Sequence, residues 1–380
     1  MRILLLAGEE SGVLYANQIR AEILRRWPEA EIRGYDDYGF KVEDLAVIGF
    51  AQVFRKIFYF LGVKKTMELA IEEWKPDVVC TVDYPGLNLK LAAYAKARGI
   101  RAVHVVCPQV WAWKRGRIPK IEAALDRLCC FFPFEPGLFK AGVAEFVGHP
   151  LVESFHAETQ RRRECSGKTL ALLPGSRMGE IEKHMPVLLE VVRRVGACQR
   201  PVGEDADGTV GGGDGKVKVV IPAANEKAYR AIASFVSRLK SPSCVLEVRR
   251  GGAREVLRQA DAAVVASGTA TLEAALAGCP TVLVYRVGWL FAIFARLVIK
   301  GVKHLGLANI IAEKAGVACP MPELLQENFT VENILHYVVP WLKDESANAA
   351  ARQSLAETMK LLRSDGGAIV RIVDQLDREG

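Results

Sequence analysis

The 380-residue chain is long enough for two or three domains, and its 50% hydrophobic content can fill one full core or two. Its formal net charge of +7 favours anionic partners, but no Lys/Arg block and no nucleic-acid-binding motif is present, which argues against DNA or RNA. The most hydrophobic stretch, residues 287–295 between Arg286 and Arg296, is far shorter than the ~20 apolar residues of a membrane-spanning helix, which argues against an integral membrane protein.

Cysteine and histidine usage argues against metal centres. The nine cysteines are scattered, form no CxxC pair and mostly fall in apolar runs, where a free thiol behaves as a small hydrophobic side chain. We therefore expect a reducing compartment, and neither a disulfide framework nor a zinc site. The six histidines include no HExxH motif and no paired spacing. The sequence predicts no metal site and no cofactor.

In chain order, short apolar runs alternate with segments of helical periodicity. The first predicted strands are Ile3–Ala7, Val78–Val82, Ala102–Val106, Leu128–Phe132 and Glu145–Val147. The helices predicted between them are Ser11–Trp27, Leu87–Arg98 and Ile118–Asp126. Continuous apolar strands that alternate with helices are typical of a parallel sheet covered on both faces.

A second series repeats this pattern from Thr169 onward. Its predicted strands are Leu170–Leu173, Val217–Ile221, Val245–Val248, Ala262–Ala266 and Thr281–Tyr285. Its predicted helices are Ile181–Val195, Asn225–Leu239, Ala253–Gln259 and Thr271–Ala277. The predicted fold class is therefore α/β, with two doubly wound, Rossmann-like domains facing a cleft, and ligands in such folds bind at the carboxyl ends of the strands.

The polar stretch 153–167 is interpreted as the seam between the two domains. We predict a first domain over residues 1–153 and a second over residues 154–345. Residues 346–380 are predicted to be C-terminal helices that pack back across the domains, with a break at residues 365–367.

Small, hydroxyl-bearing residues follow the predicted strand that ends at Ala266. Gly268 lets the backbone approach a ligand, and the free N–H groups at Thr269 and Ala270 suit a phosphate. Glu273 would repel a phosphate but could accept hydrogen bonds from ribose hydroxyls. It could equally stabilise the helix dipole beside small residues that only serve packing, so both interpretations stay open.

A similar turn, Pro174 to Arg177, follows another predicted strand of the same domain. Arg177 offers a planar fork of donors that suits a diphosphate, although an ordinary surface arginine is the simpler interpretation. Two such turns in one domain favour a shared nucleotide. Neither matches a P-loop or GxGxxG, so the usual signals of ATP hydrolysis and hydride transfer are missing.

Asp83 ends a predicted strand of the first domain. A carboxylate at this place could take a proton from a sugar hydroxyl, but taken alone it is better interpreted as a cap of the turn. The turn at residues 7–12 has the same position between strand and helix, and Glu9 and Glu10 argue against anion binding there.

Residues 53–65 crowd aromatic and aliphatic side chains beside four cations. The segment "VFRKIFYFLGVKK" predicts a basic amphipathic helix that contacts a membrane interface. An ordinary buried helix is the competing interpretation.

Taken together, these stretches resemble the lipid A disaccharide synthase family. The matching stretches occur in family order over almost the whole chain: "GEESG", "LAVIGF", "DVVCTVDYPGLN", "VWAWKRGR", "FVGHPL", "LALLPGSRMGEIE", "ASGTATLEAALAGCPTVLVYR", "NIIA" and "PELLQ". The resemblance implies a GT-B fold and an inverting glycosyltransferase that works without metal. It implies transfer of 2,3-diacylglucosamine from its UDP donor to 2,3-diacylglucosamine 1-phosphate, with release of UDP.

The resemblance also assigns residues. Asp83 matches the family's essential aspartate and is the candidate base. The residues that match substrate-binding positions are Glu9, Ser11, Gly175, Ser176, Arg177, Gly268, Thr269, Ala270, Glu273, Asn309 and Glu323. The residues that match an exposed membrane patch are Phe54, Ile57, Phe58 and Leu61.

Two departures from the family pattern fall on the acceptor side: Val13 replaces an aspartate, and the connection over residues 33–45 is short. A UDP-sugar epimerase or hydrolase of the same fold, and a non-catalytic lipid-binding relative, therefore stay open as alternatives. The implied partners are a UDP-sugar lipid donor, a phosphorylated glycolipid acceptor and an anionic membrane. The implied location is cytoplasmic, peripheral on the inner face of the cytoplasmic membrane, and the sequence leaves an oligomer open.

Overall fold

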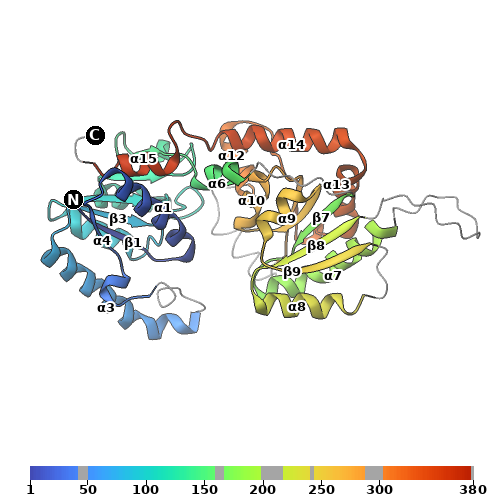
Figure 1. The fold of residues 1–380 in the computed structure, drawn as a ribbon, viewed down its shortest axis with the longest axis horizontal. Helices are drawn as coiled ribbons and strands as arrows, with labels where there is room; N and C mark the ends of the chain where they lie inside the picture. The colour runs from blue at the N-terminus through green and yellow to red at the C-terminus, as the bar shows by residue number, and fades with distance from the viewer. Residues whose placement is uncertain (42–49, 159–166, 198–216, 240–243, 287–302, 378–380) are drawn as a thin grey trace, which may run out of the picture. The chain divides into compact units, whose positions relative to one another are not determined.

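The computed structural model describes residues 1–41, 50–158, 167–197, 217–239, 244–286 and 303–377, without the side chains of residues 10, 11, 50–57, 156–158, 196 and 197. The chain forms two compact units, one of Met1–Glu153 with Leu362–Gly380 and the other of Ser154–Leu361. Residues 346–380, predicted as one set of C-terminal helices, are divided between the units at Leu361. Figure 1 shows a sheet with flanking helices in each unit.

The first unit is built on a six-stranded parallel sheet in the order β2-β1-β3-β4-β5-β6. Its strands are β1 (Arg2–Ala7), β2 (Glu31–Arg33), β3 (Val78–Val82), β4 (Arg101–Val105), β5 (Arg127–Cys130) and β6 (Ala144–Phe146). The chain moves from β1 outward to β2 and then returns past β1 to β3, so the topological switch point lies between β1 and β3.

Helices cover both faces of this sheet because most residues of its central strands are buried and apolar, and their side chains alternate in direction. Ile3 and Leu5 of β1 pack in one cluster with α1 and α15, whereas Leu4 and Leu6 pack in another with α3 and α4. The helices of this unit are α1 (Glu10–Arg26), α3 (Phe50–Trp74), α4 (Asn88–Lys96), α5 (Ile118–Ala124) and α15 (Ala368–Asp374). Helix α6 (Pro150–Glu158) spans the boundary between the units.

The second unit repeats the design with a parallel sheet in the order β12-β11-β10-β7-β8-β9. Its strands are β7 (Thr169–Leu173), β8 (Lys218–Ala223), β9 (Val245–Arg250), β10 (Ala262–Ala266), β11 (Thr281–Tyr285) and β12 (Glu323–Leu325). The chain runs outward from β7 to β9, then continues from β10 to β12 on the other side. The switch point therefore lies between β7 and β10.

Helices also flank the second sheet. Leu170 and Leu172 of β7 pack in one core with residues of α7, α8 and α13, while α9 and α10 lie against the strands as well. The helices of this unit are α7 (Met178–Ala197), α8 (Glu226–Val236), α9 (Ala253–Gln259), α10 (Thr269–Leu276), α12 (Leu307–Ala315), α13 (Val331–Lys343) and α14 (Glu345–Lys360).

The predicted strands are confirmed, three of them with the same bounds: β3, β10 and β11. The short edge strands β2 and β12 were not predicted, because three residues carry too little apolar pattern. The predicted helix over residues 53–65 is part of the longer α3. The stretches 203–215 and 287–295 lie outside the described residues.

Candidate active site

In the first unit, the predicted base lies at the switch point of the sheet. Glu9 follows β1 and Asp83 follows β3, and these two strands are hydrogen-bonded neighbours. Ligands of doubly wound sheets bind where the strand order reverses. The fold therefore brings two carboxylates, distant in sequence, to the place where a substrate is expected.

Asp83 and Tyr84 both have left-handed backbone conformations, with φ of +52° and +51°. Aspartate tolerates this region, but for a bulky tyrosine it is a strained conformation that costs about 1–3 kcal/mol. Gly8 makes room for the Tyr84 ring, because a Cβ at residue 8 would lie 2.5 Å from Tyr84 Cδ1. Strain of this kind concentrates at functional sites, which supports a role for this turn.

Asn88, which is fully buried, holds the turn in place. Its amide nitrogen donates to the Asp83 carbonyl at 2.8 Å and to the Val82 carbonyl at 3.2 Å, and its amide oxygen accepts from the Tyr35 hydroxyl at 2.7 Å. The Asp83 amide donates to Val105 O of the neighbouring strand at 2.9 Å. The Asp83 backbone is thus fixed from two sides, and its half-buried carboxylate accepts from the Tyr84 amide at 2.8 Å.

The surroundings raise the pKa of both acids. Burial raises the pKa of Asp83 above its usual 3.8, and the Tyr84 amide offsets part of that rise. Desolvation and the Asp83 charge raise the pKa of Glu9. Desolvation, with Glu9 and Tyr59 nearby, raises the pKa of Tyr84 to about 12. A carboxylate with a raised pKa is a better general base than an exposed one, once it is ionised.

In the second unit, the two predicted nucleotide turns are also brought together. Residues 175–177 follow β7 and residues 268–270 follow β10, and these strands pair directly across the switch point. Gly268, Thr269, Ser176 and Arg177 are exposed. An exposed edge with two helix N-termini is suited to an anionic ligand.

The turn after β7 has a defined internal structure. Gly175 has φ +110°, and a Cβ there would lie 2.4 Å from Glu180 Oε2, so this position needs glycine. The Glu180 carboxylate accepts from the Arg177 amide and its guanidinium, both at 3.4 Å. The Arg177 side chain is 82% exposed. Its long, exposed ion pair leaves the guanidinium available to a ligand.

At the turn after β10, the hydroxyl of Thr271 donates to the Gly268 carbonyl at 2.7 Å and stabilises the first turn of α10. Glu273 lies one turn further on, with its side chain 16% exposed, and its Oε1 accepts from Arg254 Nε at 2.8 Å. Arg254 from α9 thus fixes one oxygen of the predicted ribose-binding acid.

Asn309 and Glu323 lie close together, and both side chains hydrogen-bond to other groups of the protein. The Asn309 amide donates to Met321 O at 2.7 Å and to Glu323 Oε1 at 2.9 Å. Glu323 also accepts from the Leu305 and Gly306 amides at 2.9 and 3.0 Å, at the start of α12. Glu323 is in register with the middle of β11, not with its carboxyl end. These contacts indicate that Asn309 and Glu323 stabilise the α12 region.

Comparison with known proteins assigns the family. The model of the lipid-A-disaccharide synthetase family matches residues 3–367. The lipid-A-disaccharide synthase of Myxococcus xanthus is 36% identical over 385 residues, which cover 97% of this chain and 94% of the relative. That of Syntrophus aciditrophicus is 33% identical over 386 residues, with 96% and 94% covered. The chain belongs to the lipid-A-disaccharide synthetase family. This confirms the predicted activity class, a glycosyltransferase of lipid A synthesis.

Solved structures support the fold of a family member. Acinetobacter baumannii MurG aligns with a TM-score of 0.58 and 13% identity, covering 99% of this chain and 98% of that one. A UDP-N-acetylglucosamine 2-epimerase from Listeria monocytogenes, named as putative, aligns with a TM-score of 0.61 and 11% identity, covering 98% and 94%. At these identities the likeness shows the fold alone, and it confirms two Rossmann-like domains of the GT-B class.

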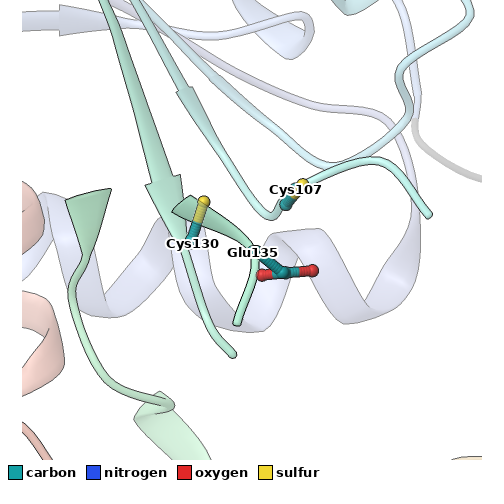
Figure 2. Close-up of side chains that lie close together, drawn as sticks. All are labelled: Cys107, Cys130 and Glu135. Atoms are coloured by element: carbon teal, nitrogen blue, oxygen red, sulfur yellow. The ribbon is translucent and has the colours of Figure 1, made fainter. Parts of the chain in front are cut away.

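One group of side chains in this lipid-A-disaccharide synthetase family member could hold a metal ion. Among the described residues, the ligand atoms of Cys107, Cys130 and Glu135 all lie within 4.8 Å of one another (Figure 2). Yet Glu135 already accepts from Trp111 Nε1 and the Phe132 amide, both at 3.1 Å, and burial raises its pKa to about 8. The hydrogen bond with Cys107, followed by burial, raises the pKa of the Cys130 thiol; the same hydrogen bond lowers the pKa of Cys107, but burial and the nearby Glu135 raise it overall. A protonated, hydrogen-bonded cluster is a poor fit to a cation.

The predicted membrane patch is described in part. Phe58 and Leu61 of α3 are 81% and 57% exposed, whereas the side chains of Phe54 and Ile57 lie outside the described residues, as does that of Ser11. Large exposed apolar side chains on one helix are the pattern of an interaction surface. In the described part of the chain, no helix combines the length and hydrophobicity needed to cross a bilayer.

Sequence reasoning missed one residue that links the turns of the second unit. His184 of α7 is fully buried; its Nδ1 lies 2.8 Å from Pro174 O and its Nε2 accepts from the Arg286 amide at 3.1 Å. Desolvation lowers its pKa, which keeps the ring neutral, with the Nδ1 proton directed at Pro174. The partners lie 10 and 102 residues away in sequence, so no local motif signals this role.

Proposed function

We propose that this protein transfers 2,3-diacylglucosamine from its UDP donor to 2,3-diacylglucosamine 1-phosphate, and that the transfer inverts the anomeric carbon. Family membership supports this substrate pair. The observation that carries the proposal is the complementary chemistry at the two switch points. One presents a strained, half-buried aspartate, and the other presents two amide-rich turns with an exposed arginine.

In the proposed mechanism, Asp83 removes a proton from the acceptor hydroxyl while this oxygen attacks the anomeric carbon of the donor. The bond from that carbon to the diphosphate breaks on the opposite face, and UDP leaves. Arg177 and the N-terminal amides of α10 stabilise the charge that develops on the leaving diphosphate. Glu273 accepts hydrogen bonds from the ribose hydroxyls of UDP.

Glu9 has a supporting role in this proposal. Its carboxylate lies close enough to Asp83 for the two charges to interact, and it is exposed at the end of β1. We propose that Glu9 accepts a hydrogen bond from the acceptor sugar. We assign Asn309 and Glu323 only a positioning role, because both side chains already hydrogen-bond to other groups of the protein.

The exposed face of α3 supports peripheral contact with the inner face of the cytoplasmic membrane. Phe58 and Leu61 are exposed apolar side chains, and Lys65, which is also exposed, lies one turn further along. This combination suits an anionic bilayer, in which apolar side chains insert and cations meet the lipid headgroups. Both lipid substrates reside in such a bilayer, so the proposed activity and the proposed location agree.

A product assay tests the proposed function. Purified protein is given UDP-2,3-diacylglucosamine with and without 2,3-diacylglucosamine 1-phosphate, and UDP and disaccharide are both quantified. We expect UDP release only when the acceptor is present, with one disaccharide formed per UDP. UDP release without acceptor would indicate a hydrolase, and epimerised sugar nucleotide would indicate an epimerase. Tight lipid binding without any product would indicate a non-catalytic relative.

A further inference from the structure

Two apolar cavities meet at the turn that carries Asp83. The α4–α5 groove, about 380 Å³ in volume, lies between helices α4 and α5. The α3–α4 pocket, about 350 Å³, lies beside helix α3. Gly86 and Lys90 line both cavities, so the two share an edge. Each volume is at the lower end of the range for small-molecule sites.

Apolar side chains form the walls of both cavities. In the α4–α5 groove, Leu89, Ile121 and Ala124 are buried, and the half-buried Ala93 of α4 also lines the groove. In the α3–α4 pocket, the walls come from Phe60, Leu61, Tyr84 and Leu87. Such walls offer no partner to a sugar ring but match a hydrocarbon chain.

Cations, without carboxylates, complete the lining of the α4–α5 groove. Lys90 and Lys120 are exposed and Arg117 is half-buried. None of the three makes an ion pair with another described residue, and no Asp or Glu lines either cavity among the described residues. An apolar groove with an unpaired cationic rim is complementary to a ligand that joins a hydrocarbon chain to a phosphate.

We propose that these two cavities hold the two acyl chains of the phosphorylated glycolipid acceptor, and that the rim cations bind its phosphate. The proposal rests on the proposed function and names the subsite that this function needs. The first residues of the walls, Tyr84 to Gly86, directly follow Asp83, so chains seated here hold the acceptor sugar at the base.

A substitution that fills the groove tests this assignment. Ala93→Phe places a ring in the groove, and Ala97→Phe, one helical turn along at an exposed position outside it, is the matched control. In the unsubstituted protein and the control, each methylene removed from the acceptor chains should raise the acceptor KM about fourfold. In Ala93→Phe this dependence should be nearly lost for the one acceptor chain seated in the groove and kept for the chain in the α3–α4 pocket, while the dependence on donor chain length stays unchanged. Loss of the donor dependence instead would overturn the proposal.

The rim is tested separately. Lys120→Gln should raise the KM about tenfold for the phosphorylated acceptor and leave the KM of its dephosphorylated analogue unchanged. An equal effect on both would show that Lys120 does not bind phosphate.

A binding readout distinguishes failure of the subsite from failure of the proposed function, and it needs no substituted protein. The probe is 2,3-diacylglucosamine 1-phosphate with a diazirine in one acyl chain, crosslinked to the full chain by light. We expect crosslinks in α3, α4 and α5 that survive an excess of phosphatidylglycerol. Crosslinks elsewhere in an active enzyme would overturn the subsite alone. Crosslinks here without transferase activity would overturn the function alone, and competition by phosphatidylglycerol would assign the cavities to bulk membrane lipid instead.

Discussion

Arg254 Nε lies 2.8 Å from Glu273 Oε1, so a cation from α9 holds the acid that follows the β10 turn. One carboxylate oxygen is thereby fixed, and the orientation of the other follows from it. A ribose needs an acceptor in a set orientation, because its two hydroxyls are adjacent and fixed. Arg254 is therefore a positioning residue in the proposed donor site.

We predict that Arg254→Ala weakens UDP binding roughly tenfold, the effect of losing one well-placed hydrogen bond. It should also bind 2′,3′-dideoxy-UDP almost as well as UDP, whereas the unsubstituted protein should favour UDP. Both affinities can be measured by calorimetry. Arg258→Ala is the control, because Arg254 and Arg258 both lie over the Phe155 ring, at 5.5 and 5.0 Å. An Arg254→Ala protein that still discriminates against the dideoxy analogue contradicts the prediction.

The pH dependence of turnover should report the acid pair. Burial raises the pKa of Asp83, and a base must be ionised, so kcat/KM should fall with decreasing pH at a midpoint above 3.8. The Asp83 charge raises the pKa of Glu9, so the two acids are coupled, and Glu9→Gln should move this midpoint to lower pH. Glu29→Gln, at an exposed site after α1, should leave the midpoint in place. A midpoint unmoved by Glu9→Gln would mean that Glu9 and the titrating group are not coupled.

His184 should matter to UDP binding although it lies beneath the site. It connects the carbonyl of Pro174 to the amide of Arg286, and Arg286 in turn donates to Phe329 O at 2.7 Å. We predict that His184→Ala weakens UDP binding by about tenfold or more, since one buried and one partly buried hydrogen bond are lost. His184→Gln, which can keep one of them, should recover part of the affinity.

The same histidine should make stability depend on pH. Its pKa is lowered in the folded protein, so its neutral form stabilises the fold above pH 6.5, and this contribution is lost as the pH falls below that value. Urea unfolding of His184→Gln should therefore vary less between pH 5 and 6.5 than unfolding of the unsubstituted protein. If the free energy of unfolding changed equally with pH in the two proteins, ionisation of His184 would not contribute to the pH dependence of stability.

Glu135 should make the free energy of unfolding depend on pH in the opposite direction. Its pKa is raised to about 8, so the folded protein binds a proton that the unfolded chain releases between pH 4.5 and 8. The free energy of unfolding should fall as the pH rises through this window, by up to roughly 3–4 kcal/mol between pH 5 and 8. Glu135→Gln keeps the hydrogen-bonding shape without the ionisation and should flatten the profile. A free energy of unfolding that falls more steeply with rising pH in Glu135→Gln would contradict the prediction.

Much of the fold followed from the sequence because its central strands are buried on both faces. A run such as residues 262–266 has no polar interruption and can only be a buried strand or a buried helix, and its length of five residues settles the choice. The edge strands β2 and β12 have mixed exposure and three residues each, so pairing with a neighbour defines them. No local pattern can supply that neighbour.

The sequence identified the turns of the site and favoured one shared nucleotide for the two turns of the second domain. The pattern of strand, small residues and helix identified residues 175–177 and 268–270, whereas the role of Asp83 was implied only by the resemblance to the family. The order of strands in the sheet determines which turns lie side by side, and no local sequence pattern gives that order. The contacts that support the turns, from Asn88, His184 and Arg254, join segments up to 102 residues apart and depend on tertiary packing.

The exposed face of α3 should control membrane association. We predict that Phe58→Ser with Leu61→Ser lowers binding to phosphatidylglycerol vesicles by about tenfold or more, because each buried apolar side chain contributes about 1.5–3 kcal/mol. Leu14→Ser is a matched control, since Leu14 of α1 is 58% exposed and Leu61 is 57% exposed. Equal losses of vesicle binding in both proteins would show that the exposed face of α3 is not the membrane-binding surface.

In the proposed mechanism, everything depends on Asp83 as the base of the glycosyl transfer. The most direct test of this role is the turnover of Asp83→Asn with saturating donor and acceptor, measured with the UDP affinity of the same preparation. We expect a kcat lower by about 10²–10⁴-fold, the usual contribution of a general base, with UDP affinity unchanged. Turnover close to that of the unsubstituted protein would contradict it.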